Sequence, residues 1–179
     1  MNKQAKIVAM GVCVTAGAAG AGEVTFQDPG IFSPFDNAQV EFVWMGSIAG
    51  YTGELSWVDN AFEAAPQMLW NNKAATTGDT IVLPRLFSQG ERVDLNYSVI
   101  VGNQDSFSTA EHADWSQFTV EATNPLDVLV GVEDIRYPAG DMDHNDASFR
   151  VVFSEVAVPA PGSMLLLGGG CLVMARRRR

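Results

Sequence analysis

The sequence predicts an all-β protein, an antiparallel β-sandwich of jelly-roll-like type, and three observations support this class. Apolar and polar residues alternate over several short segments, which is the period of a strand with one face on a core. Residues that favour turns, such as glycine, proline, asparagine and aspartate, separate these segments. No segment carries the apolar stripe of a long amphipathic helix. Many short strands joined by turns are typical of sandwiches.

The expected strands follow one another along the chain. Alternation predicts strands at residues 40–44, 55–57, 93–101, 118–121 and 149–153, with every second side chain on the core. Residues 129–132 are apolar throughout, which predicts a more central strand. Turn signals lie at residues 28–30, 33–34, 71–72, 77–79, 89–90, 124–125 and 138–140. Residues 108–111 read as a capping box, but too few apolar residues follow for more than a short helix.

The first 21 residues read as a secretory signal peptide with a short helix. Lys3 and Lys6 precede an apolar core at residues 7–16, and Ala19 and Ala21 form an A-x-A cleavage signal. A retained membrane anchor would need roughly 20 apolar residues, more than this core offers. We therefore expect cleavage after residue 21 and export of the rest of the chain.

Residues 158–179 form a tail of three parts. Its proline motif consists of Val158, Pro159, Ala160 and Pro161. The prolines end the preceding strand, because proline has no N–H to donate to a sheet. An apolar run at residues 164–175 would make a helix of about 18 Å, which is short for an ordinary membrane anchor. The basic cluster, expected on the cytoplasmic side, consists of Arg176, Arg177, Arg178 and Arg179.

This tail resembles the PEP-CTERM sorting signal of bacterial exported proteins. The resemblance implies that an exosortase, a membrane cysteine protease, recognises the chain and removes the tail near residues 159–163. It also implies transient retention at the inner membrane, followed by delivery to the cell surface or the extracellular space. Ala160 departs from the pattern, since the family name places a glutamate there.

The domain between the two ends, residues 22–157, is strongly acidic and free of cysteine. All 21 acidic residues lie in it, whereas six of the 11 basic residues lie in the ends, so its net charge is 5 minus 21, or −16. Its basic residues are Lys73, Arg85, Arg92, Arg136 and Arg150. This balance argues against nucleic acid as a partner and leaves carboxylates for divalent cations. Both cysteines, Cys13 and Cys171, lie outside the domain, which excludes a disulfide or a thiolate metal site within it.

An acidic loop connects the last two expected strands. Asp141, Asp143 and Asn145 stand at positions 1, 3 and 5, a spacing that aims oxygen ligands inward in calcium loops. The loop is not an EF-hand, because its sixth position is Asp146 and its flanks are strands. The predicted metal ligands are Asp134, Asp141, Asp143, Asn145 and Asp146, with Ca²⁺ as the ion and Glu133 as a further carboxylate at the strand end. The competing interpretation is that these side chains cap backbone amides in Asx-turns and remain in water.

The same segment carries a second resemblance. Gly131-Val132-Glu133-Asp134, followed by D-x-D-x-N-D and a strand, resembles the C-terminal hallmark of an uncharacterised extracellular β-domain family that often precedes PEP-CTERM tails. The resemblance implies an all-β exported domain with a metal loop and no enzymatic activity. His144 departs from the pattern, because an aromatic residue is expected in its place.

The chemistry-bearing motifs favour a protein that is not an enzyme. His112 and His144 lack metal-ligand spacing, and no nucleophile elbow, phosphate loop or nucleotide fingerprint occurs. The leading hypothesis is an exported, non-catalytic cell-surface or matrix protein that is stabilised by Ca²⁺. The alternative is a carbohydrate-binding module for extracellular polysaccharide. Trp70 and Trp115, beside turns, are its candidate aromatic contacts, whereas Trp44 and Trp57 are expected in the core.

Overall fold

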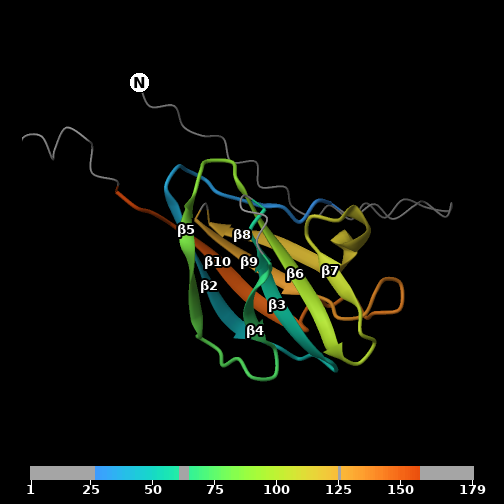
Figure 1. The fold of residues 1–179 in the computed structure, drawn as a ribbon. Coiled ribbons are helices and arrows are strands. Elements are labelled where there is room, and N and C mark those ends of the chain that lie inside the picture. Colours follow the sequence, from blue (N-terminus) through green and yellow to red (C-terminus); the bar gives the residue numbers. More distant parts are fainter. Residues whose placement is uncertain (1–26, 61–64, 125, 158–179) are drawn as a thin grey trace, which may run out of the picture.

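The computed structural model describes residues 27–60, 65–124 and 126–157 (Figure 1). The predicted signal peptide with Ala19 and Ala21, and the predicted sorting tail at residues 158–179, lie outside the described residues, as do the two helices expected there. Within the described ranges, no helix combines the length and the apolar character needed to cross a membrane.

Ten strands of the described residues form two antiparallel sheets, which confirms the predicted all-β class (Figure 1). In the first sheet the strand order is β1-β6-β3-β4, with β7 also paired to β6, and in the second it is β5-β2-β10-β9-β8. The strands are β1 (Ile31–Phe32), β2 (Ala38–Gly46), β3 (Thr52–Val58), β4 (Gln67–Asn71), β5 (Thr80–Phe87), β6 (Arg92–Val101), β7 (Ser106–Ser108), β8 (Phe118–Asn124), β9 (Asp127–Val132) and β10 (Ala147–Glu155). A 3₁₀ helix, η1 (His112–Gln117), follows the predicted capping box.

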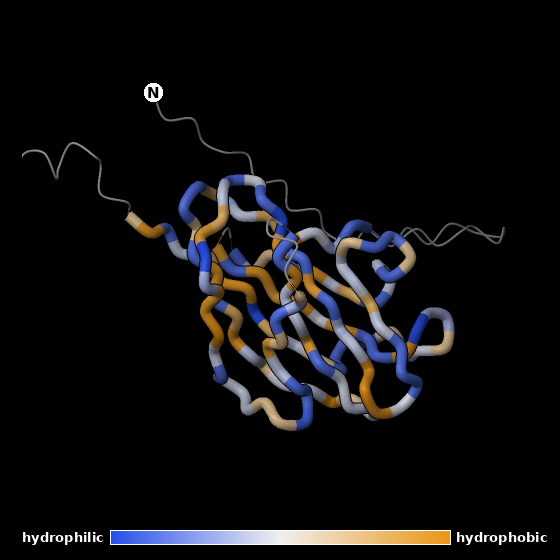
Figure 2. Tube along the Cα trace, in the orientation of Figure 1, coloured by the Kyte–Doolittle hydropathy of each residue, from blue (hydrophilic) through white to orange (hydrophobic). Residues whose placement is uncertain are grey.

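The two sheets pack against each other across one hydrophobic core. Trp70 of β4 meets Phe42 and Trp44 of β2, with ring centroids 6.4 and 5.4 Å apart, and Trp57 of β3 meets Phe87 of β5 at 6.0 Å. Hydrophobic positions recur along the strands, while the connections are mostly hydrophilic (Figure 2). Trp70, a candidate aromatic contact for a carbohydrate, is therefore buried between the sheets.

The alternating segments bury the side chains that their pattern predicts. In β6, Val93, Leu95, Tyr97 and Val99 face the core. The alternation fails at Val101, which is 62% exposed because β6 extends past the edge of the core there. The continuous apolar segment at 129–132 lies in β9, which pairs with β8 on one side and β10 on the other, so its predicted interior position is confirmed.

Four connections meet at one end of the sheets: residues 47–51, 72–79, 102–105 and 133–146. The last of these, the β9–β10 connection, bonds to two of the others. Ile48 N donates to Asn145 O at 2.9 Å, and Asn103 Nδ2 donates to Asp134 O at 3.2 Å. The acidic loop is thus held against its neighbours at this end.

Candidate metal centre

Three buried carboxylates meet where the β9–β10 connection leaves and rejoins its sheet. Glu133 and Asp134 directly follow β9, and Asp146 directly precedes β10. These residues are 1%, 2% and 8% exposed. One oxygen of each lies within 4.8 Å of the other two. We call Glu133, Asp134 and Asp146 the inner group.

Strand pairing brings the inner group together. Val132 and Ala147 are partners in the β9–β10 ladder, so the residues just beyond them face each other. Asp146 N donates to Val132 O at 3.1 Å, and Asp134 N donates to Asp146 Oδ2 at 2.7 Å. From the β2–β3 connection, Tyr51 N donates to Asp134 Oδ2 at 3.2 Å. These amide donors orient the two aspartates but carry no net charge to offset theirs.

Glu133 is the least satisfied member of the inner group. Its Oε1 accepts a long hydrogen bond, 3.4 Å, from Ile135 N, and a side-chain hydrogen bond with the carboxyl group of Asp141 favours its protonated form. Its Oε2 is buried and has no hydrogen-bond partner among the described residues. A buried carboxylate oxygen without a partner is costly, because burial removes its water and nothing replaces it. Glu133 is therefore in an environment that a proton or a metal ion would complete.

A second group shares Glu133 with two exposed aspartates. One oxygen each of Glu133, Asp141 and Asp143 lies within 4.8 Å of the others, and we call these residues the outer group. The predicted ligand Asn145 adjoins this group, but its side-chain amide donates to Asp143 Oδ2, and its main-chain N donates to Asp143 Oδ1 at 3.2 Å. The Asx-turn expected as the competing interpretation is thus present at Asp143.

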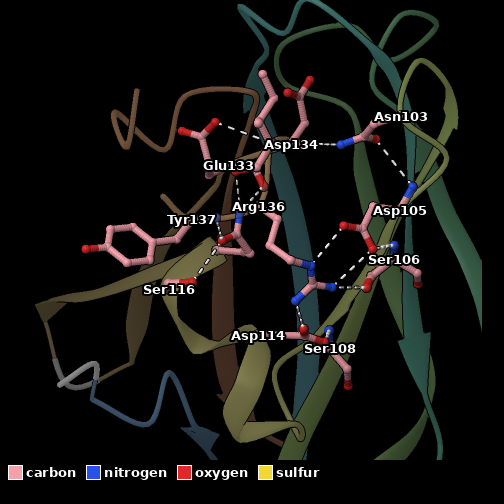
Figure 3. A network of polar contacts seen from close by, with 12 residues as sticks. Asn103, Asp105, Ser106, Ser108, Asp114, Ser116, Glu133, Asp134, Arg136 and Tyr137 are labelled. Carbon is pink, nitrogen blue, oxygen red and sulfur yellow. Dashed lines mark hydrogen bonds and ion pairs between the residues drawn. The ribbon is translucent and has the colours of Figure 1, made fainter. Parts of the chain in front are cut away.

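Arg136, which lies within the β9–β10 connection, does not neutralise the acidic residues of that connection. Arg136 turns toward Asp105 and Asp114, which its Nε and Nη1 meet at 2.9 and 2.7 Å (Figure 3). The other arginines of the described residues, Arg85, Arg92 and Arg150, form ion pairs with acids outside both groups. Lys73 donates to Ala49 O and lowers the pKa of Asp134 by its charge. Among the described residues, the charge of one lysine therefore faces the five carboxylates of the two groups.

Burial and mutual repulsion shift the inner group toward its protonated form. Burial, followed by the charge of Asp146, raises the pKa of Glu133 to about 7. Burial raises the pKa of Asp146 to about 6, and the charges of Asp134, Asp143 and Asp141 act in the same direction. The pKa of Asp134 is also raised, mainly by burial. At neutral pH, holding all three carboxylates charged therefore costs free energy that a bound cation would offset.

The histidines and tryptophans occupy structural positions. His144 places Nδ1 3.0 Å from Met142 O and Nε2 3.0 Å from Ser116 O, so main-chain oxygens engage both ring nitrogens. The ring of His112 packs edge-on against that of Trp115, with centroids 4.6 Å apart. Trp115 Nε1 donates to Thr109 O at 3.1 Å. Trp115 is only partly exposed, which leaves little aromatic surface for the carbohydrate-binding alternative.

The structure separates the predicted ligands into two groups and gives Glu133 a larger role than spacing suggested. Asp134 joins Asp146, Asp141 joins Asp143, and Glu133 belongs to both groups. A signal for this was present, because Glu133 directly follows the uninterrupted apolar run of β9. An acid that extends a buried strand is expected to share its burial.

The donor set consists of oxygen alone, which suits hard divalent cations such as Ca²⁺ and Mg²⁺ rather than thiolate-seeking metals. Three carboxylates supply up to six oxygens, the lower end of the coordination number that Ca²⁺ adopts. The acidic residues thus form a group that is able to hold a metal ion. Comparison of the chain with protein-family models, curated proteins and solved structures finds no match.

Proposed function

We propose that this chain is an exported, non-catalytic protein of the cell surface or extracellular matrix whose β domain is stabilised by Ca²⁺ bound to the inner group. One observation supports the metal above all others. Glu133 Oε2 is buried, lacks a hydrogen-bond partner and points among carboxylates that lack a matching positive charge. An ion bound there would supply both the missing partner and the missing charge.

The choice of Ca²⁺ follows from the shape of the group and from the compartment. The inner carboxylates come from irregular backbone at two strand ends, and Ca²⁺ accepts irregular oxygen cages of six to eight ligands. Mg²⁺ demands near-octahedral geometry and keeps several waters, which a group this buried would have to exclude or replace. Ca²⁺ sites of extracellular modules operate at about 10⁻⁴–10⁻³ M.

Export and sorting rest on the two ends of the sequence. The signal peptide predicts translocation, and the tail resembles the PEP-CTERM signal, so we propose an exosortase-like protease as partner and exopolysaccharide as a candidate matrix partner. The domain itself we describe as a jelly-roll-like sandwich, because the chain passes repeatedly from one sheet to the other.

Thermal unfolding of the full chain in chelator and in millimolar Ca²⁺ tests the metal proposal. At a Ca²⁺ concentration a hundredfold above Kd, binding to the folded state alone stabilises it by about 2.7 kcal/mol. The double variant Asp134→Asn/Asp146→Asn should lose this increase in Tm. Glu155→Gln, an exposed acid at the opposite end of β10, should keep it. Equal Tm values in Ca²⁺ and in chelator would refute the proposal.

A further inference from the structure

We infer that the acidic loop holds a second cation, bound by the outer group and sharing Glu133 with the first. This inference rests on the proposed inner site, because Glu133 is the ligand common to both. The geometry gives each group three carboxylate oxygens within 4.8 Å of one another. A carboxylate with two oxygens is able to bridge two ions, which lie about 3.5–4 Å apart in two-metal sites.

The outer group contains the same buried and incompletely satisfied acid as the inner one, Glu133. Glu133 is 1% exposed and lacks a partner for Oε2, and this side chain is aimed at Asp141 and Asp143 as well as at the inner aspartates. Exposed aspartates alone would spread apart in water. Here two of them stand beside a buried charge that they repel, which favours a cation between them.

Gly140 keeps the side of Glu133 next to Asp141 open. A Cβ at position 140 would lie 2.6 Å from Glu133 Oε1 and 2.6 Å from Ile135 O, closer than real Cβ atoms approach. The chain turns into the outer group immediately after this glycine. The absence of a side chain at this position therefore lets Oε1 face the segment that carries the outer aspartates.

The charge balance favours two ions over one. The two groups together contain five carboxylates (Glu133, Asp134, Asp141, Asp143 and Asp146). Among the lysines and arginines of the described residues, Lys73 alone acts on them, so their charge is −5 + 1, or −4, when all are ionised. One divalent cation leaves −2, whereas two bring the sum to zero. The four arginines of the described residues are already paired elsewhere.

The two sites differ in exposure, which sets their order of affinity. The inner ligands are all buried, whereas Asp141 and Asp143 are exposed. The outer ion would complete its coordination with water and exchange with solvent, so we expect its Kd to be at least about tenfold higher than that of the inner ion. Occupancy of the outer site would follow the extracellular Ca²⁺ concentration.

Isothermal titration of the full chain with Ca²⁺, after removal of metal by chelator, tests this inference. The expected result is two ions per chain with unequal affinity, and Asp141→Asn/Asp143→Asn should bind one ion while keeping the Ca²⁺-dependent rise in Tm. Gly140→Ala should weaken the outer site, while Gly50→Ala, whose Cβ meets nothing within 4 Å, should not.

The failures of the two proposals give different results. One ion per chain, unchanged by Asp141→Asn/Asp143→Asn, would overturn the outer site and leave the inner one standing. One ion that this double variant abolishes would overturn the two-site arrangement, because all the acids would then serve a single ion. No binding at all would overturn both proposals.

Discussion

At the scale of single residues, the burial of Glu133 makes the candidate metal centre sensitive to protons and to cations. Glu133 is as deeply buried as the core aliphatic residues, yet it is an acid whose Oε2 has no partner among the described side chains and amides. In the absence of a metal ion, the folded chain lowers this cost by binding protons, so pH and cations act on the same group.

This competition predicts how stability without metal depends on pH. The folded-state pKa of Glu133, about 7, lies above its ordinary value of 4.5, and that of Asp146, about 6, lies above 3.8. The folded state therefore binds more protons than the unfolded state in this range. The stability they contribute is complete below about pH 4 and is lost as pH rises through 6 to 7. We expect the free energy of unfolding in chelator to fall by roughly 2–4 kcal/mol between pH 5 and pH 8.

Denaturant unfolding in chelator at both pH values measures this loss. Glu133→Gln, which keeps the shape and removes the charge, should remove its share of the pH dependence. Saturating Ca²⁺ should also flatten the curve. A stability that rises from pH 5 to pH 8 in chelator would contradict the expectation.

At the scale of elements, Arg136 fastens the acidic loop to the first sheet. Its guanidinium bonds Asp105 before β7 and Asp114 in η1 (Figure 3). It also lies 4.9 Å from the ring centroid of Phe107. Its hydrogen bonds are the largest cause that lowers the pKa of Asp105, so this pair contributes stability at neutral pH that is lost as pH falls below the ordinary value of that acid.

Replacing this arginine should loosen the loop. Because the Arg136 side chain is 42% exposed, solvent screens part of each ion pair, and we expect Arg136→Met to cost about 1–2 kcal/mol of unfolding free energy. Arg150→Met, which breaks a pair with the single acid Asp127, should cost less. Urea denaturation at pH 7 measures both values. Equal losses would show that Arg136 is an ordinary surface ion pair.

The strands show how much of the fold could be predicted from the sequence. The alternation of Val40, Phe42 and Trp44 identified strand β2 and its buried face, because a period of two needs only local information. The pairing of β2 with β10 joins residues about a hundred positions apart, and local pattern carries no record of such partners. For the same reason, the sequence did not show that Trp70 lies between the sheets.

In the candidate site, too, features that are local in sequence could be predicted, whereas contacts between distant residues could not. The acidic loop and its flanking strands were visible as a run of acids after an apolar segment, and four of the five predicted ligands, Asp134, Asp141, Asp143 and Asp146, lie in the two groups. The partner of Arg136 was not visible, because Asp105 and Asp114 reach it only through the packing of the first sheet and η1.

At the scale of the whole molecule, the acidic loop and the last described residues lie at opposite ends. β10 begins beside the loop at Ala147 and runs away from it to Glu155, which pairs with Ala38 (Figure 1). β1 also lies at this far end, since Phe32 pairs with Arg92 at the start of β6. If the proposed tail holds the domain at a membrane, the metal centre faces outward, toward the medium that supplies Ca²⁺.

Site-directed labelling of the full chain in lipid vesicles tests this orientation. The domain contains no cysteine, so replacing Cys13 and Cys171 by serine leaves a background for single cysteines at exposed positions. Ser88→Cys lies at the far end, between β5 and β6, and Ala139→Cys lies in the acidic loop. We expect nitroxide lipids to quench a fluorophore at position 88 severalfold more than a fluorophore at position 139. Contact quenching requires proximity to the bilayer, and the two positions lie at opposite ends of a domain about 30 Å across. Equal quenching at the two positions would mean that the tail does not orient the domain, and stronger quenching at 139 would place the metal centre against the membrane instead.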